Sequence, residues 1–528
     1  MIQRLSSHVR STPCQSSTIL VGIAGLFSLL VSSNAMAVSC DFKNGDNFTD
    51  ICGYLEAGVV QTGGQVKVHV ASKTSNFEVR LRRAGYANPT LQTAPFSGAG
   101  NYNPTVGSHN GLNWGGAFSV GIPATWQSGI YELNLVNAQG GSYTDFFTIK
   151  SAQPGSHSKV LVLDSLPTKI AYSPIGGKSM YVFNSDNGQW ATEVSMERPT
   201  GRGQWAEHVG FVSWLDKEGI AYEAASMMDL HRDPSLLHNY NLVILVGHNE
   251  YWSKEMRDNW DSYLAAGGNA ANLSGNTMWW QVRFSADNKH MICYKNASND
   301  PLKNDNSRVT VNWFNSPVNR PENLSTGVSF RHGGYADYTE GGVNYRNDGF
   351  TVTDASHWIF EGTGLGNGSI FGRDSGVIGY EVDGALFKMV NGKPVVTGED
   401  GTPTNFQILA TTPAFAIDSP TGVPGIVPSN HEGQGWGTLG IFKPSANSGT
   451  VFVAPTIDWG EYIQNDQIVG RITKNVINRL KSRTTDAGAS TSTTVTLPTS
   501  SGGGGGSFPL VSLLLGLMVA VGLRARKR

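Results

Sequence analysis

The segment 241–253, NLVILVGHNEYWS, restricts the fold of this chain more than any other part of it. Its apolar run, 242–246, is followed almost at once by His248 and Glu250. A continuous apolar run of this length is typical of a strand buried in a parallel sheet. Open α/β sheets hold their ligands at the carboxyl ends of such strands. The segment therefore predicts a ligand site at the edge of a parallel sheet.

His248 and Glu250 are two residues apart, so an extended backbone places both side chains on the same side. An imidazole and a carboxylate that share one crevice can bind a metal or exchange protons. The alternative is a strand end at which the two groups only form local hydrogen bonds. Ser253 is a good N-cap for a helix, which we expect over 254–265.

The rest of this region alternates between strand-like and helix-like patterns. Apolar strands are expected at 159–164 and 220–225, with an intervening helix over 208–218. This alternation predicts a parallel, doubly wound sheet. From about 305 onward the chain becomes β-rich and is expected to elaborate the α/β core, ending in an amphipathic helix over 466–481.

Residues from about 54 to 150 have the pattern of an all-β unit. Apolar and polar residues alternate cleanly in 65–71 and 77–82, and further strands are expected at 117–122, 128–136 and 143–150. The size and spacing favour a small immunoglobulin-like sandwich. We therefore divide the body into a β-sandwich domain, 38–154, and an α/β domain with β-rich insertions, 155–482.

Both ends of the chain carry sorting features. Arg4 and Arg10 precede an apolar run and the small-residue sequence NAMA at 34–37, which is typical of a signal peptide over 1–37. At the other end, the Ser/Thr/Gly-rich stretch 483–506 has the composition of a linker. The final segment, 507–528, is apolar with a basic end.

The C-terminal arrangement resembles the GlyGly-CTERM sorting signal of Gram-negative bacteria. That resemblance implies a rhomboid-type protease as a partner at the C-terminal segment. The alternative is a plain C-terminal membrane anchor, although the apolar stretch is short for a full span. Either interpretation predicts export across the inner membrane to the cell surface or the medium.

Charge and cysteine content narrow the function further. The chain has 39 Lys and Arg against 41 Asp and Glu, and removing the signal and tail leaves 33 against 41. This mildly acidic body argues against a nucleic-acid partner. Cys40 and Cys52 lie close together in an exported chain, so a disulfide between them is plausible. Cys293 is interpreted as a buried thiol.

A second segment of interest is Gly275-Asn276-Thr277, which we interpret as a turn from a strand into a helix. In a class I glutamine-amidotransferase-like sheet this turn is the nucleophile elbow, where Cys or Ser is expected. Here the position holds Asn276, which cannot attack but can donate a hydrogen bond to a developing oxyanion. The expected fold is therefore amidotransferase-like, without the thiol mechanism.

Several segments together resemble the large (beta) subunits of N,N-dimethylformamidases over about 120–480. They are Trp126 to Tyr131, Ala171-Tyr172, Gly176 to Tyr181, Arg198-Pro199, Trp214-Leu215, Gly247 to Ser253, Gly275-Asn276, Trp280, Arg283, Val377 to Glu381 and Asp458-Trp459. The resemblance implies a mononuclear Fe(III) site with two tyrosines and one glutamate, hard oxygen donors suited to this ion. Carried over, Tyr172 and Glu250 are metal ligands, His248 is the nearby acid or base, and Asn276 orients the substrate or the oxyanion.

The second tyrosine departs from the family pattern. We expect it directly after Arg198-Pro199, but Thr200 stands there. Tyr181, Tyr251 or His208 could take its place, or the iron could be absent.

Three functions remain open on the sequence. The first is an exported hydrolase that cleaves a C–N bond in a small-molecule or peptide amide. The second is a non-catalytic surface protein that binds a glycan or peptide on a degenerate amidase fold. The third is a carbohydrate-active enzyme, which needs a second carboxylate such as Glu207, Asp229 or Glu381.

Overall fold

The computed structural model describes residues 51–482, apart from 57, 73, 88–89, 98–107, 115–116, 337, 341–342, 346–347 and 416–433. The signal, the linker, the C-terminal segment and Cys40 lie outside the described residues. Within the described part of the chain, no helix has the length and apolar character needed to cross a bilayer.

The body is built on a large mixed sheet of 11 strands, whose order is β11-β9-β12-β14-β27-β26-β25-β17-β22, with β20 and β21 attached at β25. The first five strands of this order are parallel, which confirms the predicted parallel core. The strands beyond β27 are antiparallel and come from the β-rich part of the chain. The parallel strands are β9 (Val160–Leu163), β11 (Glu223–Ala225), β12 (Leu242–His248), β14 (Asn269–Gly275) and β27 (Val451–Val453). The others are β17 (Ser329–Tyr335), β20 (Phe350–Val352), β21 (Ile370–Phe371), β22 (Glu381–Gly384), β25 (Gln407–Phe415) and β26 (Gln434–Phe442).

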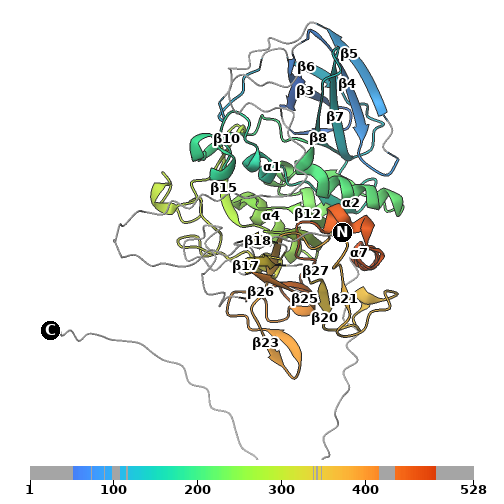
Figure 1. Ribbon diagram of the computed structural model, residues 1–528, viewed down its shortest axis with the longest axis vertical. Coiled ribbons are helices and arrows are strands. Elements are labelled where there is room, and N and C mark those ends of the chain that lie inside the picture. Colours follow the sequence, from blue (N-terminus) through green and yellow to red (C-terminus); the bar gives the residue numbers. More distant parts are fainter. Residues whose placement is uncertain are drawn as a thin grey trace, which may run out of the picture. The chain divides into compact units, whose positions relative to one another are not determined.

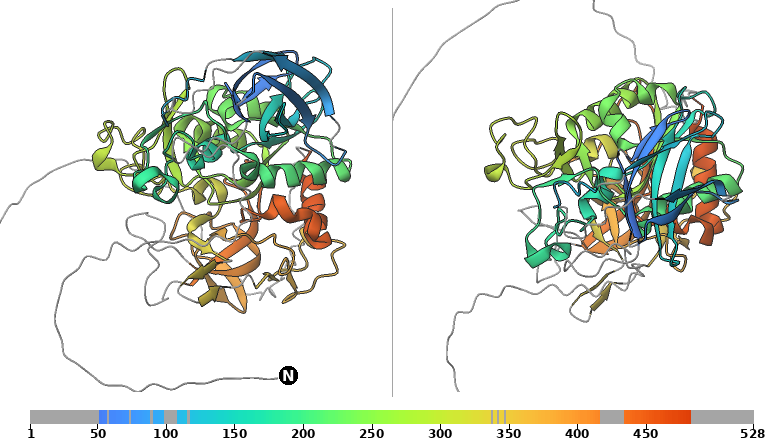
Figure 2. Two further views of the ribbon diagram at one scale, coloured as in Figure 1. Left: turned by 45° about the horizontal axis from the view of Figure 1, so that its top comes forward. Right: turned by 90° about the horizontal axis from the view of Figure 1, so that it is seen from above.

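Helices follow the parallel strands, as the alternating pattern predicted. The apolar residues of β12 are buried, and β12 is followed by α4 (Lys254–Ala265), whose first turn is capped by the Ser253 hydroxyl. The last helix, α7 (Gln467–Leu480), begins at the Asp466 cap and buries one apolar face. Figure 2 shows the last helices of the described chain in red, and the short helix Trp459–Tyr462 contacts α2 (Ala206–Lys217). The remaining helices are α1 (Leu166–Tyr172), α3 (Met227–Arg232), α5 (Asn323–Thr326) and α6 (Trp459–Tyr462).

The N-terminal residues form two small sheets, ordered β1-β3-β6 and β2-β8-β7-β4-β5. Their buried side chains, such as Val68 and Leu133, belong to one shared apolar core. The strands are β1 (Ile51–Leu55), β2 (Val59–Gln61), β3 (Gln65–Ser72), β4 (Asn76–Arg83), β5 (Thr90–Ser97), β6 (Phe118–Gly121), β7 (Gly129–Asn137) and β8 (Ser142–Lys150).

These sheets are joined to the α/β core by polar contacts as well as by apolar packing. Figure 1 shows α1 and α2 between the N-terminal strands and the large sheet. Arg83 pairs with Asp216 of α2 at 2.7 Å, and Thr148 donates to the buried Asp164 at 2.6 Å. The Asp164 carboxylate also receives the Ser226 hydroxyl at 3.0 Å, so it links β8 to two segments of the core.

The turn at Asn276 differs from the expected strand-to-helix elbow, and that part of the sequence interpretation is wrong. After β14 the chain enters β15 (Trp280–Phe284) rather than a helix. Asn276 and Met278 both have a left-handed backbone, with φ of 49° and 58°, which is incompatible with the start of a right-handed helix. β15 belongs to a separate four-stranded sheet with β10 (Glu193–Ser195), β16 (His290–Ile292) and β13 (Tyr251–Ser253).

The cysteines behave as the sequence indicated where the structure describes them. Cys52 is disulfide-bonded, and its partner lies outside the described residues. Cys293 is a free, fully buried thiol, and burial raises its pKa to about 12. A thiol held so far from ionisation is a poor nucleophile.

Candidate functional site

Two phenols converge on one carboxylate at the carboxyl ends of the parallel strands. Tyr172, the last residue of α1, donates to one oxygen of Glu250 at 3.0 Å. Tyr181 donates to the other oxygen at 2.5 Å. The rings of Tyr172 and Tyr181 stack with centroids 4.4 Å apart, and the Glu250 side chain is completely buried. The three oxygen-bearing side chains thus form a compact donor set.

The segment between the two tyrosines is fixed by hydrogen bonds to its backbone. Arg198 is buried and donates to the carbonyls of Ser173 at 2.8 Å, Lys178 at 3.2 Å and His109 at 2.6 Å. Burial without a carboxylate partner lowers the pKa of this guanidinium to about 9. The Arg198-Pro199 motif is therefore part of the frame that holds both phenols, and one anchor, His109, precedes the α/β core.

His248, the last residue of β12, lies between two carboxylates. Its Nε2 is 3.3 Å from Glu250 and 2.9 Å from Glu381, the first residue of β22. Burial lowers the pKa of this imidazole, but the two carboxylates outweigh burial and hold the pKa well above its usual value. Burial raises the pKa of Glu250, whereas His248, Lys295 and Tyr181 more than offset it and lower the pKa. Each side chain thus favours the charged form of the other.

Asn276 is held beside His248 by the turn that follows β14. Its side-chain NH2 lies 3.4 Å from His248 Nε2 and 3.4 Å from a Glu381 oxygen. Its side-chain carbonyl is buried and has no partner among the described residues. Asp383 accepts the backbone N–H groups of Asn276 at 2.7 Å and of Thr277 at 3.1 Å. The backbone donors that an elbow would offer to an oxyanion are thus bound to the carboxyl group of Asp383.

Lys295 adds a positive charge to the site that the sequence did not indicate. Its ammonium lies 3.6 Å from the ring centroid of Tyr181 and donates to the Met180 carbonyl at 2.9 Å. Trp280 and two other rings surround it at 4.9 to 5.4 Å. Burial lowers the pKa of this ammonium to about 8, although the charge of Glu250 opposes that change. The contact is a cation–π interaction that fixes the ring of Tyr181.

The structure brings together all four residues selected from the sequence, Tyr172, His248, Glu250 and Asn276. Of the three candidates for a second tyrosine position, Tyr181 contacts Glu250 directly. Tyr251 meets Tyr181 edge to face with centroids 6.3 Å apart. The Nδ1 atom of His208 instead lies 3.3 Å from the Lys169 ammonium, within a separate buried cluster.

Sequence reasoning missed Lys295 and Asp383, and it considered Glu381 only as a possible carboxylate for sugar chemistry. Glu381 had a usable signal, since it ends the motif 377–381 that resembles the family. Lys295 follows a short strand of mixed polarity, and nothing in its neighbourhood marks it. Asp383 is two residues beyond Glu381, so an alternating strand places both carboxylates on the same side.

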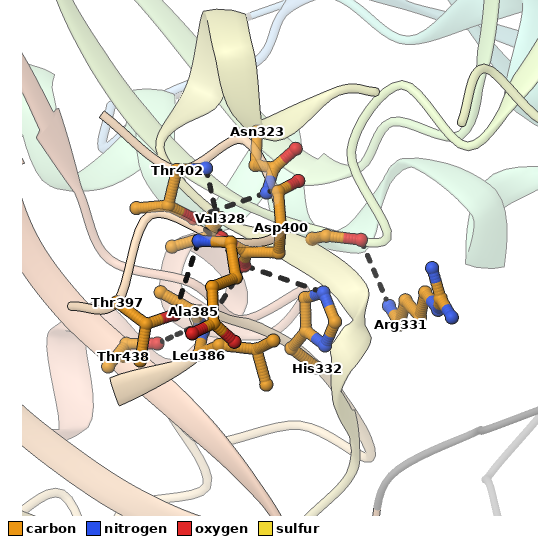
Figure 3. Close-up of polar contacts among 12 residues, drawn as sticks. Asn323, Val328, Arg331, His332, Ala385, Leu386, Thr397, Asp400, Thr402 and Thr438 are labelled. Atoms are coloured by element: carbon orange, nitrogen blue, oxygen red, sulfur yellow. Dashed lines mark hydrogen bonds and ion pairs between the residues drawn. The ribbon is translucent and has the colours of Figure 1, made fainter. Parts of the chain in front are cut away.

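A second polar cluster, around Asp400, lies apart in the antiparallel part of the sheet (Figure 3). The Asp400 carboxylate accepts the Leu386 N–H at 3.2 Å and the Thr402 N–H at 3.0 Å, and His332 lies 3.4 Å from it. The Asp400 carbonyl accepts the Asn323 side chain at 2.8 Å. These bonds tie loops together, and we interpret the cluster as structural.

Carboxylate and nitrogen ligands alone do not form a metal centre in the described part of the chain. No group of three or more His, Cys, Asp or Glu side chains there has the arrangement of a metal site. The convergent donors at Glu250 are instead one carboxylate and two phenols. This set is unusual for zinc but suited to a hard trivalent ion.

The comparisons with known proteins agree with the sequence resemblance. Residues 78–469 match the family described as N,N-dimethylformamidase beta subunit-like, C-terminal. Because the match spans most of the chain, this protein belongs to that family.

Two N,N-dimethylformamidase beta subunits are distant relatives. The one from Alcaligenes sp. is 25% identical over 296 residues, which cover 51% of this chain and 36% of the relative. The one from Paracoccus aminophilus is 22% identical over 435 residues, which cover 69% of this chain and 54% of the relative. The matches thus cover only about a third to a half of these relatives. Among solved structures, a superoxide reductase (neelaredoxin) from Ignicoccus hospitalis is 16% identical, and the match covers 20% of this chain and 82% of that protein. Its TM-score of 0.14 is too low to indicate a shared fold.

Proposed function

We propose that this protein is an exported hydrolase that cleaves a C–N bond of an amide-like substrate with a ferric ion. The observation that carries the proposal is the convergence of Tyr172 and Tyr181 on the two oxygens of Glu250, at 3.0 and 2.5 Å. The distant similarity to N,N-dimethylformamidase beta subunits supports the same reaction class. Dimethylformamide itself is not expected to be the substrate.

The donor set fits the ion that the family implies. Tyr172, Tyr181 and Glu250 would hold it, with Tyr181 in the role for which Thr200 is unsuited. Burial, together with the Glu250 charge, raises the pKa of both phenols well above the usual value. A bound trivalent cation would provide the positive charge that two partly buried phenolates beside a buried carboxylate require. Such an ion would polarise an amide carbonyl and lower the pKa of a bound water.

The neighbouring side chains can move the protons that amide cleavage requires. His248 holds a proton between Glu250 and Glu381 and can deliver it to the nitrogen of the leaving amine. Glu381, only 5% exposed, can then return a proton to the imidazole from water. The Asn276 amide can orient a polar group of the substrate, since its carbonyl has no protein partner among the described residues. Lys295 offsets negative charge at Tyr181.

The amidotransferase-like description of the parallel core and the immunoglobulin-like description of the N-terminal sheets are part of this proposal. So are the domain boundaries at 38, 155 and 483. Export and C-terminal processing by a rhomboid-type protease rest on 1–37 and 483–528.

The first experiment measures iron content and the visible spectrum of the purified protein after loading with ferric iron. We expect one iron per chain and a tyrosinate-to-iron charge-transfer band. Glu250→Ala should lose the iron, and Tyr172→Phe and Tyr181→Phe should weaken the band. Tyr294→Phe is the matched control and should leave the band unchanged. Hydrolysis of formamide and acetamide should require the iron.

A protein that takes up no iron would contradict the proposal. That outcome would favour the alternative of a non-catalytic binding protein, to be tested with glycans and peptides. Uptake of iron with an unchanged band in Tyr181→Phe would contradict the role of Tyr181 alone.

A further inference from the structure

Beside the two phenols, the chain exposes apolar surface that folding normally buries. Among the described residues, four large apolar side chains are more than half exposed, and two of them, Val182 and Phe183, are consecutive. Phe183 is 59% exposed, yet its ring lies 5.5 Å from that of Tyr181 and 6.3 Å from that of Tyr172. The exposed ring therefore borders the donor set.

Hydrogen bonds fix the backbone of the turn that carries Phe183. Phe183 belongs to the short 3-10 turn η1 (Val182–Asn184). The Asn184 amide donates to the Tyr172 carbonyl at 2.7 Å, and the Ser185 hydroxyl donates to the Tyr181 carbonyl at 2.7 Å. The Ser179 N–H donates to the Ser185 hydroxyl at 3.0 Å. Because these contacts fix the backbone on both sides of the ring, Phe183 is held in place rather than folded back onto the core.

A fixed, exposed aromatic ring is suited to bind an apolar group that reaches it from the site. Exposed apolar area costs free energy until a ligand covers it. A pair of aromatic rings in contact contributes about 0.5–1.5 kcal/mol beyond the covered area. A substrate no larger than formamide, bound at Glu250, would leave the ring uncovered. The ring therefore favours a substrate that extends beyond its amide group.

We infer that Phe183 is a specificity-determining residue, and that the substrate is an amide carrying an aromatic or bulky apolar substituent that packs on its ring. The inference rests on the proposed function for the reaction itself. The binding of an apolar group to Phe183 does not depend on the proposed function, because the exposed ring is present in the folded chain whether or not the protein cleaves amides. Val182, which is 57% exposed, extends the same surface.

The test compares ring-bearing and small amides on the iron-loaded protein. Phenylacetamide places a ring on the acyl side and is compared with acetamide, and N-benzylformamide places one on nitrogen and is compared with formamide. We expect kcat/KM for at least one ring-bearing amide to exceed that of its small counterpart at least threefold. Phe183→Ser should reduce that ratio about three- to tenfold. Met389→Ser is the matched control, since Met389 is 61% exposed on the hairpin of β23 (Phe387–Val390) and β24 (Lys393–Val396), and it should leave the ratio unchanged.

A binding arm separates this inference from the proposed function. Binding of 4-fluorophenylacetamide is followed by fluorine NMR, whether or not the protein turns over any amide. If the protein turns over no amide, the proposed function fails. Binding that is at least threefold weaker in Phe183→Ser would still support the role of the Phe183 ring in binding the apolar group. If the protein turns over amides, the inference is overturned when neither ring-bearing amide is preferred. It is overturned equally if Phe183→Ser changes neither the ratio nor the binding by more than twofold.

Discussion

Asp383→Asn tests how the turn that presents Asn276 is held. In the folded protein Asp383 is fully buried and accepts two consecutive backbone N–H groups. Burial raises the pKa of this carboxyl from its ordinary 3.8 to about 7, although the hydrogen bonds from Thr277 and Asn276 oppose the change. The folded protein therefore keeps the proton up to about pH 7, whereas the unfolded chain releases it near pH 4.

The sign of the effect follows from this difference. Between those pH values the folded state binds more protons than the unfolded state, so the free energy of unfolding falls as the pH rises. A tenfold change in proton affinity is worth about 1.4 kcal/mol, so the whole window is worth about 4 kcal/mol. That stability is fully present below about pH 4 and is lost as the pH passes 7. Asp383→Asn has no such proton, so its stability should lack this component.

The assay is urea unfolding, followed by tryptophan fluorescence, at pH 4.5, 6 and 7.5. The difference in unfolding free energy between the wild type and Asp383→Asn should shrink by about 3–4 kcal/mol across this range. Asp300→Asn is the matched control. Burial opposes ionisation of Asp300, but the Arg283 contact and the hydrogen bonds from Thr310 and Leu302 together outweigh burial and lower its pKa to about 2, so its effect should be constant over this range. A constant difference for Asp383→Asn as well would refute the reasoning.

Two further predictions concern the neighbours of the donor set. Glu381→Gln should lower the pKa of His248, because it removes a carboxylate 2.9 Å from the imidazole. An NMR titration of the metal-free protein measures this pKa, and an unchanged value would contradict the prediction. Arg198→Met should lower the free energy of unfolding by about 3 kcal/mol or more and impair iron uptake, because three carbonyls lose their donor. Arg202 is exposed, so Arg202→Met should change neither property. Equal stabilities of the two variants would argue against the role of Arg198.

The sequence predicted the parallel core well because its signals are local. The apolar run before His248 and the serine cap before 254–265 each specify an element without help from distant residues, and both elements were found. The part of the site that was predicted from the sequence consists of residues at or just after the ends of the parallel strands. His248 ends β12 and Glu250 follows it, Asn276 follows β14, and Tyr172 ends the helix after β9. Parallel topology brings these strand ends to the same edge of the sheet.

The remaining members of the site depend on long-range contacts. Tyr181, which we propose in place of the tyrosine expected at position 200, contacts Glu250 because the loop folds back and stacks its ring on Tyr172. Glu381 and Asp383 come from a strand that joins the sheet more than 100 residues after Asn276 in the sequence. The elbow was misjudged because the left-handed backbone at Asn276 and Met278 depends on such contacts. No pattern within 270–280 records them.

The anchoring of Arg198 to the His109 carbonyl limits how this protein can be divided. A fragment that starts at 155 contains both phenols and the carboxylate, yet it lacks the peptide that fixes the loop between them. Grafting the parallel core onto another scaffold would carry Tyr172, Tyr181 and Glu250 without the contact that fixes the loop between the two tyrosines. In evolutionary terms, the N-terminal sheets and the core are expected to be inherited as one unit, because exchanging either half alone would loosen the distance between Tyr172 and Tyr181.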